Sequence, residues 1–206
     1  MIAKILPAGH PEIKDPKHPV RYFDIRKLTE GECLKLMDVP DDMIKKLRTT
    51  TKQEYGELVG ADIKGDEKVL SKSALYKLAG NSIVVSCLRE IFENIYLTKD
   101  DPDEQFDLFP EPTFRAPIPE KIKMVTLCSG YDSQMIALRQ VAEKAGCDCE
   151  LVAWAEFDPE NKAELSKQPA VIAHNILFPE YKDRNVGDMT KADWGGYKNE
   201  EIDILT

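Results

Sequence analysis

Hydrophobic side chains follow two different periods along this chain, and these periods predict its main elements. Between residues 83 and 95 apolar side chains recur every three or four positions with charged residues between them, which predicts an amphipathic helix. Residues 124–128 are instead a short apolar run that contains β-branched residues and stops at a Ser-Gly pair. Helical spacing resumes at residues 136–142. The pattern therefore predicts a strand, a tight turn and a helix across residues 122–142.

The first part of the chain predicts an arm, a short strand and then helices. Residues 1–20 are rich in proline and polar groups and predict a loop or a loose arm, whereas residues 21–28 predict a short strand. Thr29 and Glu32 have the spacing of a capping box, in which each side chain accepts a hydrogen bond from a free N–H at the start of a helix. Pro40 is expected to end that helix.

Further polar residues mark where later helices are expected to begin. Asp41 or Asp42 is predicted to cap the second helix, and residues 49–52 are predicted to be a polar loop. Before the amphipathic helix, a glycine permits a sharp chain reversal, so that Asn81 or Ser82 is predicted to cap the helix that follows. On their own, these residues need no role beyond capping.

Three more strands are predicted after the first strand-turn-helix unit. Residues 150–155 form an apolar second strand, and Pro159 is predicted to occupy the first position of the next helix. Residues 168–178 are interpreted as a connector, residues 185–190 as a short third strand, and residues 202–206 as a fourth. Strands that alternate with helices predict an α/β fold with a parallel sheet.

Composition limits the class of protein. The chain has 206 residues, of which 42% are hydrophobic and 32% charged, so a globular domain with a real core is expected. No apolar run approaches the ~20 residues that span a bilayer. The start of the sequence lacks the layout of a signal peptide, so we expect a cytoplasmic protein without a membrane partner. The net charge of −9 argues against a broad nucleic-acid-binding face, though not against a local one.

One segment divides the chain. Residues 99–120 are acidic and rich in proline, which predicts an extended linker between residues 1–98 and residues 121–206. The five cysteines are an odd number and suit reduced thiols. Cys147 and Cys149 have no second pair or nearby histidine to complete a metal site, so no metal is expected.

The strand-turn-helix unit is a candidate ligand site. A turn of this kind brings backbone N–H groups and a helix N-terminus to one point, which suits a cofactor or an anion. Glu156 follows the second strand, where an acidic side chain is placed to bind ribose hydroxyls. The same pattern also suits an ordinary βα unit with a glycine in its turn. A dinucleotide oxidoreductase is the weaker alternative, because no G-x-G-x-x-G follows the first strand.

Four short motifs follow one another after the linker. Residues 127–133 read Leu-Cys-Ser-Gly-Tyr-Asp-Ser, residues 156–158 Glu-Phe-Asp, residues 187–190 Gly-Asp-Met-Thr, and residues 203–205 Asp-Ile-Leu. In this order and spacing, residues 122–206 resemble the opening third of the DNA cytosine-5 methyltransferases, which use S-adenosylmethionine. The resemblance implies a Rossmann-like α/β methyltransferase fold with a partial sheet and a small helical N-terminal part.

The first part of the chain resembles the end of the same family. Residues 26–37 are similar to the ninth motif of these enzymes, and residues 77–85, Lys-Leu-Ala-Gly-Asn-Ser-Ile-Val-Val, are similar to the tenth. The resemblance therefore implies a circularly permuted order, with the ninth and tenth motifs in residues 1–98 and the first to third in residues 121–206. A linker joins two such parts readily when they are neighbours in space.

The resemblance implies a role for each matched position. Residues 128–131 and Ser133 would line the methionine end of S-adenosylmethionine, and residues 81–83 would close over it. The carboxylate of Glu156 would accept the ribose hydroxyls. The implied cofactor-binding residues are Asn81, Ser82, Ile83, Cys128, Ser129, Gly130, Tyr131, Ser133, Glu156, Phe157, Asp188 and Met189.

The adenine end of the cofactor would be held by the remaining matched positions. Phe157 would face the adenine ring, Asp188 would accept from its amino group, and Met189 would pack on it. Two departures from the family stand in the first motif. Cys128 replaces an aromatic residue, and Asp132-Ser133 replaces Gly-Gly, which is expected to add bulk and negative charge beside the cofactor.

The expected function is the cofactor-binding portion of a DNA (cytosine-5-)-methyltransferase, as found in restriction-modification systems. In the complete enzyme, a thiolate in a Pro-Cys motif attacks C6 of a flipped cytosine before methyl transfer to C5. None of the five cysteines follows a proline, so no catalytic residue is assigned and the chain is expected to be inactive alone.

The sequence leaves open its origin and one alternative function. The sequence is compatible with a fragment, a broken reading frame or half of a split enzyme whose second chain supplies the remaining motifs and the contact with DNA. The alternative is a non-catalytic binding or assembly module. In it, the edge of the strand at residues 202–206 would recruit a second copy or another chain.

Overall fold

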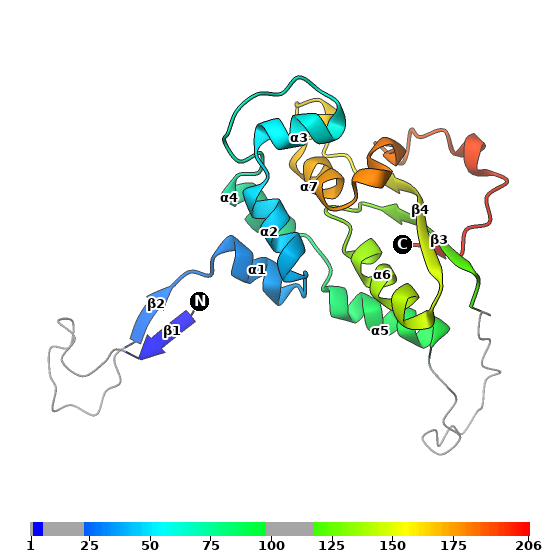
Figure 1. The fold of residues 1–206 in the computed structure, drawn as a ribbon, viewed down its shortest axis with the longest axis horizontal. Helices are drawn as coiled ribbons and strands as arrows, with labels where there is room; N and C mark the ends of the chain where they lie inside the picture. Colours follow the sequence, from blue (N-terminus) through cyan, green and yellow to red (C-terminus); the bar gives the residue numbers. More distant parts are fainter. Residues whose placement is uncertain (1, 6–22, 98–117) are drawn as a thin grey trace, which may run out of the picture.

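The protein is a mixed α/β structure in which a three-stranded parallel sheet lies beside a group of helices (Figure 1). The computed structural model describes residues 2–5, 23–97 and 118–206. The described helices are α1 (Glu30–Leu36), α2 (Asp41–Thr49), α3 (Lys52–Val59), α4 (Lys72–Gly80), α5 (Val85–Tyr96), α6 (Ser133–Ala145) and α7 (Pro169–Leu177). Short 3-10 helices cover Leu165–Lys167, Pro179–Arg184 and Trp194–Tyr197.

Two separate sheets are present in the described residues. Strands β1 (Ile2–Ile5) and β2 (Phe23–Arg26) form an antiparallel pair, whereas β3 (Lys121–Leu127), β4 (Asp148–Ala155) and β5 (Ile204–Leu205) form a parallel sheet in the order β4-β3-β5. The arm expected at the N-terminus is therefore wrong for the residues of β1. The rest of that arm, and the linker up to residue 117, lie outside the described residues.

The core is continuous between the two parts of the chain. Helix α6 packs on β3 and β4, and α5 packs along α6 (Figure 1). Leu88, Phe92 and Tyr96 form the buried stripe of α5, while Ile122 and Met124 on β3 are fully buried. Helix α7 lies against α2, α3 and α4. The two parts predicted from the sequence thus share a single hydrophobic core.

Local signals placed several helix ends correctly. The capping box predicted at the start of α1 is present, with the backbone N–H of Thr29 bonded to Glu32 and that of Glu32 to the Thr29 hydroxyl. Helix α2 begins instead after Pro40 without a side-chain cap, and the predicted caps Asp41 and Asp42 lie in its first turn. Carboxylates there still favour the positive end of the helix.

The start of α5 differs from the prediction. The helix begins at Val85 rather than at residue 83, and Asn81 ends α4 instead of capping α5. The cap Val84 has no side-chain hydrogen bond, but the N–H of Val85 donates to the carbonyl of Met37 at 3.0 Å. A bond to Met37, the residue directly after α1, therefore replaces the expected cap, and residues 81–84 form an irregular connection.

The elements after β4 were predicted wrongly. No helix begins at Pro159; the chain turns there, and the interpreted connector at residues 168–178 contains α7. All positions from Val171 to Leu177 are buried, so this helix has no polar face and shows no helical period in the sequence. The predicted third strand is reduced to one bridge between Trp154 and Asn185.

Within the described ranges, none of the helices has the length and apolar character needed to cross a membrane.

Candidate functional site

A cavity of about 650 Å³ lies where the carboxyl ends of β3 and β4 meet the connection between α4 and α5. Its wall comes from segments far apart in the sequence. Residues 77, 78 and 81–83 supply one part, residues 127–130, 133, 134 and several of 156–161 supply another, and residues 168–170 and Thr206 contribute further. Ligand sites in parallel α/β sheets lie at this end of the strands.

The structure brings most of the predicted site residues to this cavity. Those on its wall are Asn81, Ser82, Ile83, Cys128, Ser129, Gly130, Ser133, Glu156 and Phe157. Asp188 and Met189 line a smaller cavity of about 220 Å³ that shares Cys128, Glu156 and Phe157 with the larger one. Tyr131 is not on either wall: its ring is buried in the core, and burial raises the pKa of its hydroxyl to about 12.

The turn after β3 has an unusual backbone. Cys128, Gly130 and Asp132 have φ angles of 51°, 58° and 65°. Glycine adopts this left-handed region freely, but each of the two other residues costs about 1–2 kcal/mol. The amide of Ser129 donates to the Ala155 carbonyl at 3.1 Å, which ties the turn to the end of β4. Such a conformation persists only where surrounding contacts hold it.

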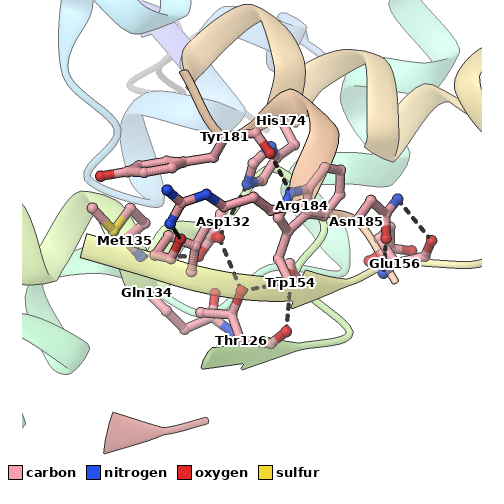
Figure 2. Close-up of polar contacts among 12 residues, drawn as sticks. Thr126, Asp132, Gln134, Met135, Trp154, Glu156, His174, Tyr181, Arg184 and Asn185 are labelled. Carbon is pink, nitrogen blue, oxygen red and sulfur yellow. Dashed lines mark hydrogen bonds and ion pairs between the residues drawn. The ribbon is translucent and has the colours of Figure 1, made fainter. Parts of the chain in front are cut away.

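Glu156 joins this turn to the tip of β4. Its Oε2 accepts a hydrogen bond from the amide of Gly130 at 2.6 Å, and its own backbone is held by the Asn185 side chain (Figure 2). Burial raises the pKa of Glu156, and the bond from Gly130 opposes that shift. A carboxylate has about four acceptor positions, so the second oxygen can accept ligand hydroxyls while the first holds the turn.

An ion pair connects the two sides of the cavity. Lys77 on α4 lies 3.1 Å from the carboxylate of Asp158, and the side chain of Lys77 lowers the pKa of that group. The backbone of Asp158 is held in turn by the buried side chain of Gln168. Among the described residues that line the cavity, Lys77 is the only basic one. The wall is therefore acidic overall, which disfavours ligands with a high negative charge.

Asp188 is engaged locally. Its Oδ1 accepts from the amide and hydroxyl of Thr190, and its Oδ2 lies 3.0 Å from Lys191. These contacts, led by the hydrogen bonds of Thr190 and Lys191, lower the pKa of Asp188 to about 2. The carboxylate is thus ionised at neutral pH, but a ligand donor has to share it with the turn and with Lys191.

The resemblance predicted that Asp132 would lie beside the cofactor, but its side chain points away from the cavity. Its carboxylate is fully buried and absent from the cavity wall, so it adds no charge beside a ligand there. It accepts from the amide of Met135 at 2.9 Å and from the hydroxyl of Thr126 at 3.0 Å, and it lies 3.3 Å from the imidazole of His174 (Figure 2). The left-handed backbone at position 132 turns the side chain inward, behind the turn.

His174 is the residue that sequence reasoning missed. It lies on α7, fully buried, with its ring stacked on Trp154 at a centroid distance of 3.6 Å. Its segment had been interpreted as a connector, so no position was predicted for its side chain. The available signal was the His174-Asn175 pair within an otherwise apolar run from Val171 to Leu177.

In the described part of the chain, no group of three or more His, Cys, Asp or Glu side chains has the arrangement of a metal site. All five cysteines are free thiols, and Cys128 is exposed on the wall shared by both cavities.

Comparisons with protein-family models, with curated proteins and with solved structures each gave no match to this chain.

Proposed function

We propose that this chain is the S-adenosylmethionine-binding portion of a DNA (cytosine-5-)-methyltransferase with a circularly permuted order of motifs and a Rossmann-like fold. One observation carries the proposal. Asn81, Ser82 and Ile83, from the motif similar to the tenth of the family, share a cavity with Gly130 and Glu156, from those similar to the first and second. A permuted enzyme requires this meeting, whereas two unrelated segments would meet there only by chance.

The residues present fit this cofactor in size and chemistry. Cavities of roughly 300–1,000 Å³ hold ligands of this size, and the main cavity has about 650 Å³. Glu156 offers a carboxylate for hydroxyl groups. Phe157 and Met189 keep 41% and 40% of their surfaces exposed, which leaves apolar area for an adenine ring. The acidic wall suits a sulfonium cation. When bound, S-adenosylmethionine supplies the methyl group.

Within this proposal the chain binds and orients, and carries no catalytic residue. The bond between Gly130 and Glu156 holds the turn at residues 128–132 in place, and residues 81–83 close the opposite side of the cavity. Attack on cytosine and the contact with DNA belong to the complete enzyme, because no cysteine of this chain follows a proline. The Cys128 thiol lies on the cavity wall, so it is part of the proposed cofactor pocket rather than a nucleophile for DNA.

Calorimetric titration tests the proposal. S-adenosylmethionine should bind the wild-type chain and NAD should not. Glu156→Gln should weaken binding by about tenfold, because it removes a charged acceptor for ribose hydroxyls. Glu143→Gln is the matched control, since Glu143 is an exposed residue of α6 away from the cavity. Absence of heat with S-adenosylmethionine would overturn the retained site.

An assembly module is the second candidate, and one observation favours it. Strand β5 is at the edge of the sheet, pairs only with β3 among the described strands, and leaves Leu205 66% exposed. Such edges recruit further strands. Light scattering distinguishes this candidate: association that Leu205→Lys abolishes supports it, and a monomer at high concentration counts against it.

A further inference from the structure

The cavity turn is supported from behind by a buried polar relay that reaches helix α7. The hydroxyl of Ser129, a residue on the cavity wall, lies 2.7 Å from the hydroxyl of Thr126. The Thr126 hydroxyl in turn lies 3.0 Å from Oδ2 of Asp132 (Figure 2). The same Oδ2 lies 3.3 Å from Nε2 of His174. Ser129, Thr126, Asp132 and His174 are each at most 4% exposed.

The number of hydrogens on each group limits which group donates to which in this relay. A carboxylate only accepts, so the single hydroxyl hydrogen of Thr126 goes to Asp132. The single hydroxyl hydrogen of Ser129 is then directed to the Thr126 hydroxyl at 2.7 Å or to the carbonyls of Thr126 and Ala155 at 3.2 and 3.4 Å. Nε2 of His174 lies 3.3 Å from Asp132, but neither imidazole nitrogen makes a hydrogen bond in the described residues. Thr126 thus links Ser129 to Asp132, and His174 approaches the same oxygen of Asp132.

The side chain of Asp132 needs polar partners because of its backbone conformation and its burial. Asp132 is a non-glycine residue in the left-handed region, at a φ angle of 65°, and its Oδ1 caps α6 through the amide of Met135. A buried carboxylate without sufficient partners is costly. His174 is the only basic side chain paired with Asp132 in the described residues, and its stacking on Trp154 fixes the plane of the ring.

We propose that His174 is a positioning residue for the ligand cavity: through Asp132 and Thr126 it holds Ser129 and the turn at residues 128–132 in the conformation that lines the cavity. His174 itself is not on the cavity wall, so it would act on a ligand only through the residues that are. This inference rests on the proposed function for the identity of the ligand, but its structural part does not depend on that identity.

Three variants separate positioning from a general contribution to folding. His174→Phe keeps a ring for Trp154 but removes the nitrogen that faces Asp132. His174→Gln restores an N–H donor. Asn175→Leu is the matched control, because Asn175 is a buried polar residue of the same helix whose amide donates to Tyr55 at 3.2 Å, away from the turn.

Amide hydrogen exchange and calorimetry with S-adenosylmethionine are the two measurements. In His174→Phe we expect faster exchange across residues 129–135 and binding about tenfold weaker, the effect of removing one partner of a buried polar contact. His174→Gln should recover most of both. Asn175→Leu should lower the melting temperature while it leaves exchange in the turn and affinity near wild type.

Each result decides one of the two claims. Equal exchange and affinity in His174→Phe and Asn175→Leu would overturn the positioning role. Failure of the wild-type chain to bind S-adenosylmethionine would overturn the proposed function instead. In that case faster exchange across residues 129–135 in His174→Phe alone would still establish that His174 positions the turn, and unchanged exchange would refute it.

Discussion

Glu156 is placed between two opposing demands. Its burial beside the cavity disfavours the ionised form and raises its pKa, while the amide of Gly130 favours the ionised form. The raised pKa shows that burial is the larger effect. The buried carboxylate therefore lowers the stability of the free protein. A ligand with hydroxyl groups would donate further hydrogen bonds to it, so we expect the carboxylate to strengthen ligand binding. Functional sites commonly contain such groups.

The first prediction concerns the stability of Glu156→Gln. Because the pKa of Glu156 is higher in the folded state, the unfolded chain ionises first as pH rises from the ordinary value of 4.5. Wild-type stability therefore falls relative to the variant between pH 4.5 and the raised pKa. Glu156→Gln should match wild type in acid and be more stable at pH 7, as measured by thermal unfolding at several pH values. A variant less stable than wild type at pH 7 would contradict this.

Asp188 gives the second prediction, with the opposite sign. Its pKa of about 2 lies below the ordinary 3.8, so its contacts with Thr190 and Lys191 stabilise the fold above pH 3.8 and lose that effect as pH falls toward 2. Asp188→Asn should lower the melting temperature at pH 7 and have little effect at pH 2. A difference of equal size at both pH values would show that charge is not the cause.

At the scale of elements, local signals worked where polar residues mark a helix end. The box at Thr29 was predicted from sequence, and a second box of the same kind at Thr51 and Glu54 was missed because the segment had been interpreted as a loop. Helix α7 could not be predicted from periodicity, because its surroundings bury every side from Val171 to Leu177. Burial from all sides is a property of the tertiary structure.

The candidate site likewise has one feature that could be predicted from the sequence and one that could not. The meeting of residues 81–83 with the turn at Gly130 was expected from the resemblance of both segments to one family, and the cavity contains both. The inward direction of Asp132 could not be predicted. It depends on a left-handed φ angle at that position and on His174, which comes from the helix that periodicity does not reveal.

The third prediction tests the unexpected box. Thr51→Ala removes the hydroxyl that accepts from the amide of Glu54 and should cost about 1 kcal/mol of unfolding free energy. Thr49→Ala is the matched control, because Thr49 is the last residue of α2 and its hydroxyl donates to the carbonyl of Lys45 instead of capping a helix start. That change should be close to neutral. Urea unfolding measures the free energy of unfolding of both variants, and an equal decrease in both would show that the cap does not stabilise the protein specifically.

At the scale of the whole molecule, the two parts of the chain are held by packing as well as by the segment between them. Helix α5 lies along α6, and α2, α3 and α4 contact α7. Polar contacts cross the same boundary. The Tyr55 hydroxyl donates to the carbonyl of Ser166 at 3.1 Å, and Lys77 pairs with Asp158 across the cavity. The cavity depends on this boundary, since its walls come from both parts.

The fourth prediction follows from this arrangement. A protease site placed between residues 107 and 108, outside the described residues, would divide the chain into fragments carrying 23–97 and 118–206. Because buried side chains such as Phe92 hold α5 on α6, the cleaved fragments should elute together in size-exclusion chromatography. They should also keep the ligand affinity of the uncut chain, as measured by calorimetry, because the walls of the cavity stay in place.

The control for that experiment removes the packing and leaves the cleavage unchanged. Phe92→Asp puts a charge on the buried stripe of α5, so its fragments should separate after cleavage while the uncut variant stays in one piece. Co-elution of wild-type fragments beside separation of the variant would establish that packing unites the two walls. Separation of the wild-type fragments would show that the intervening segment does so, and the cavity would then lose its value as support for a permuted methyltransferase.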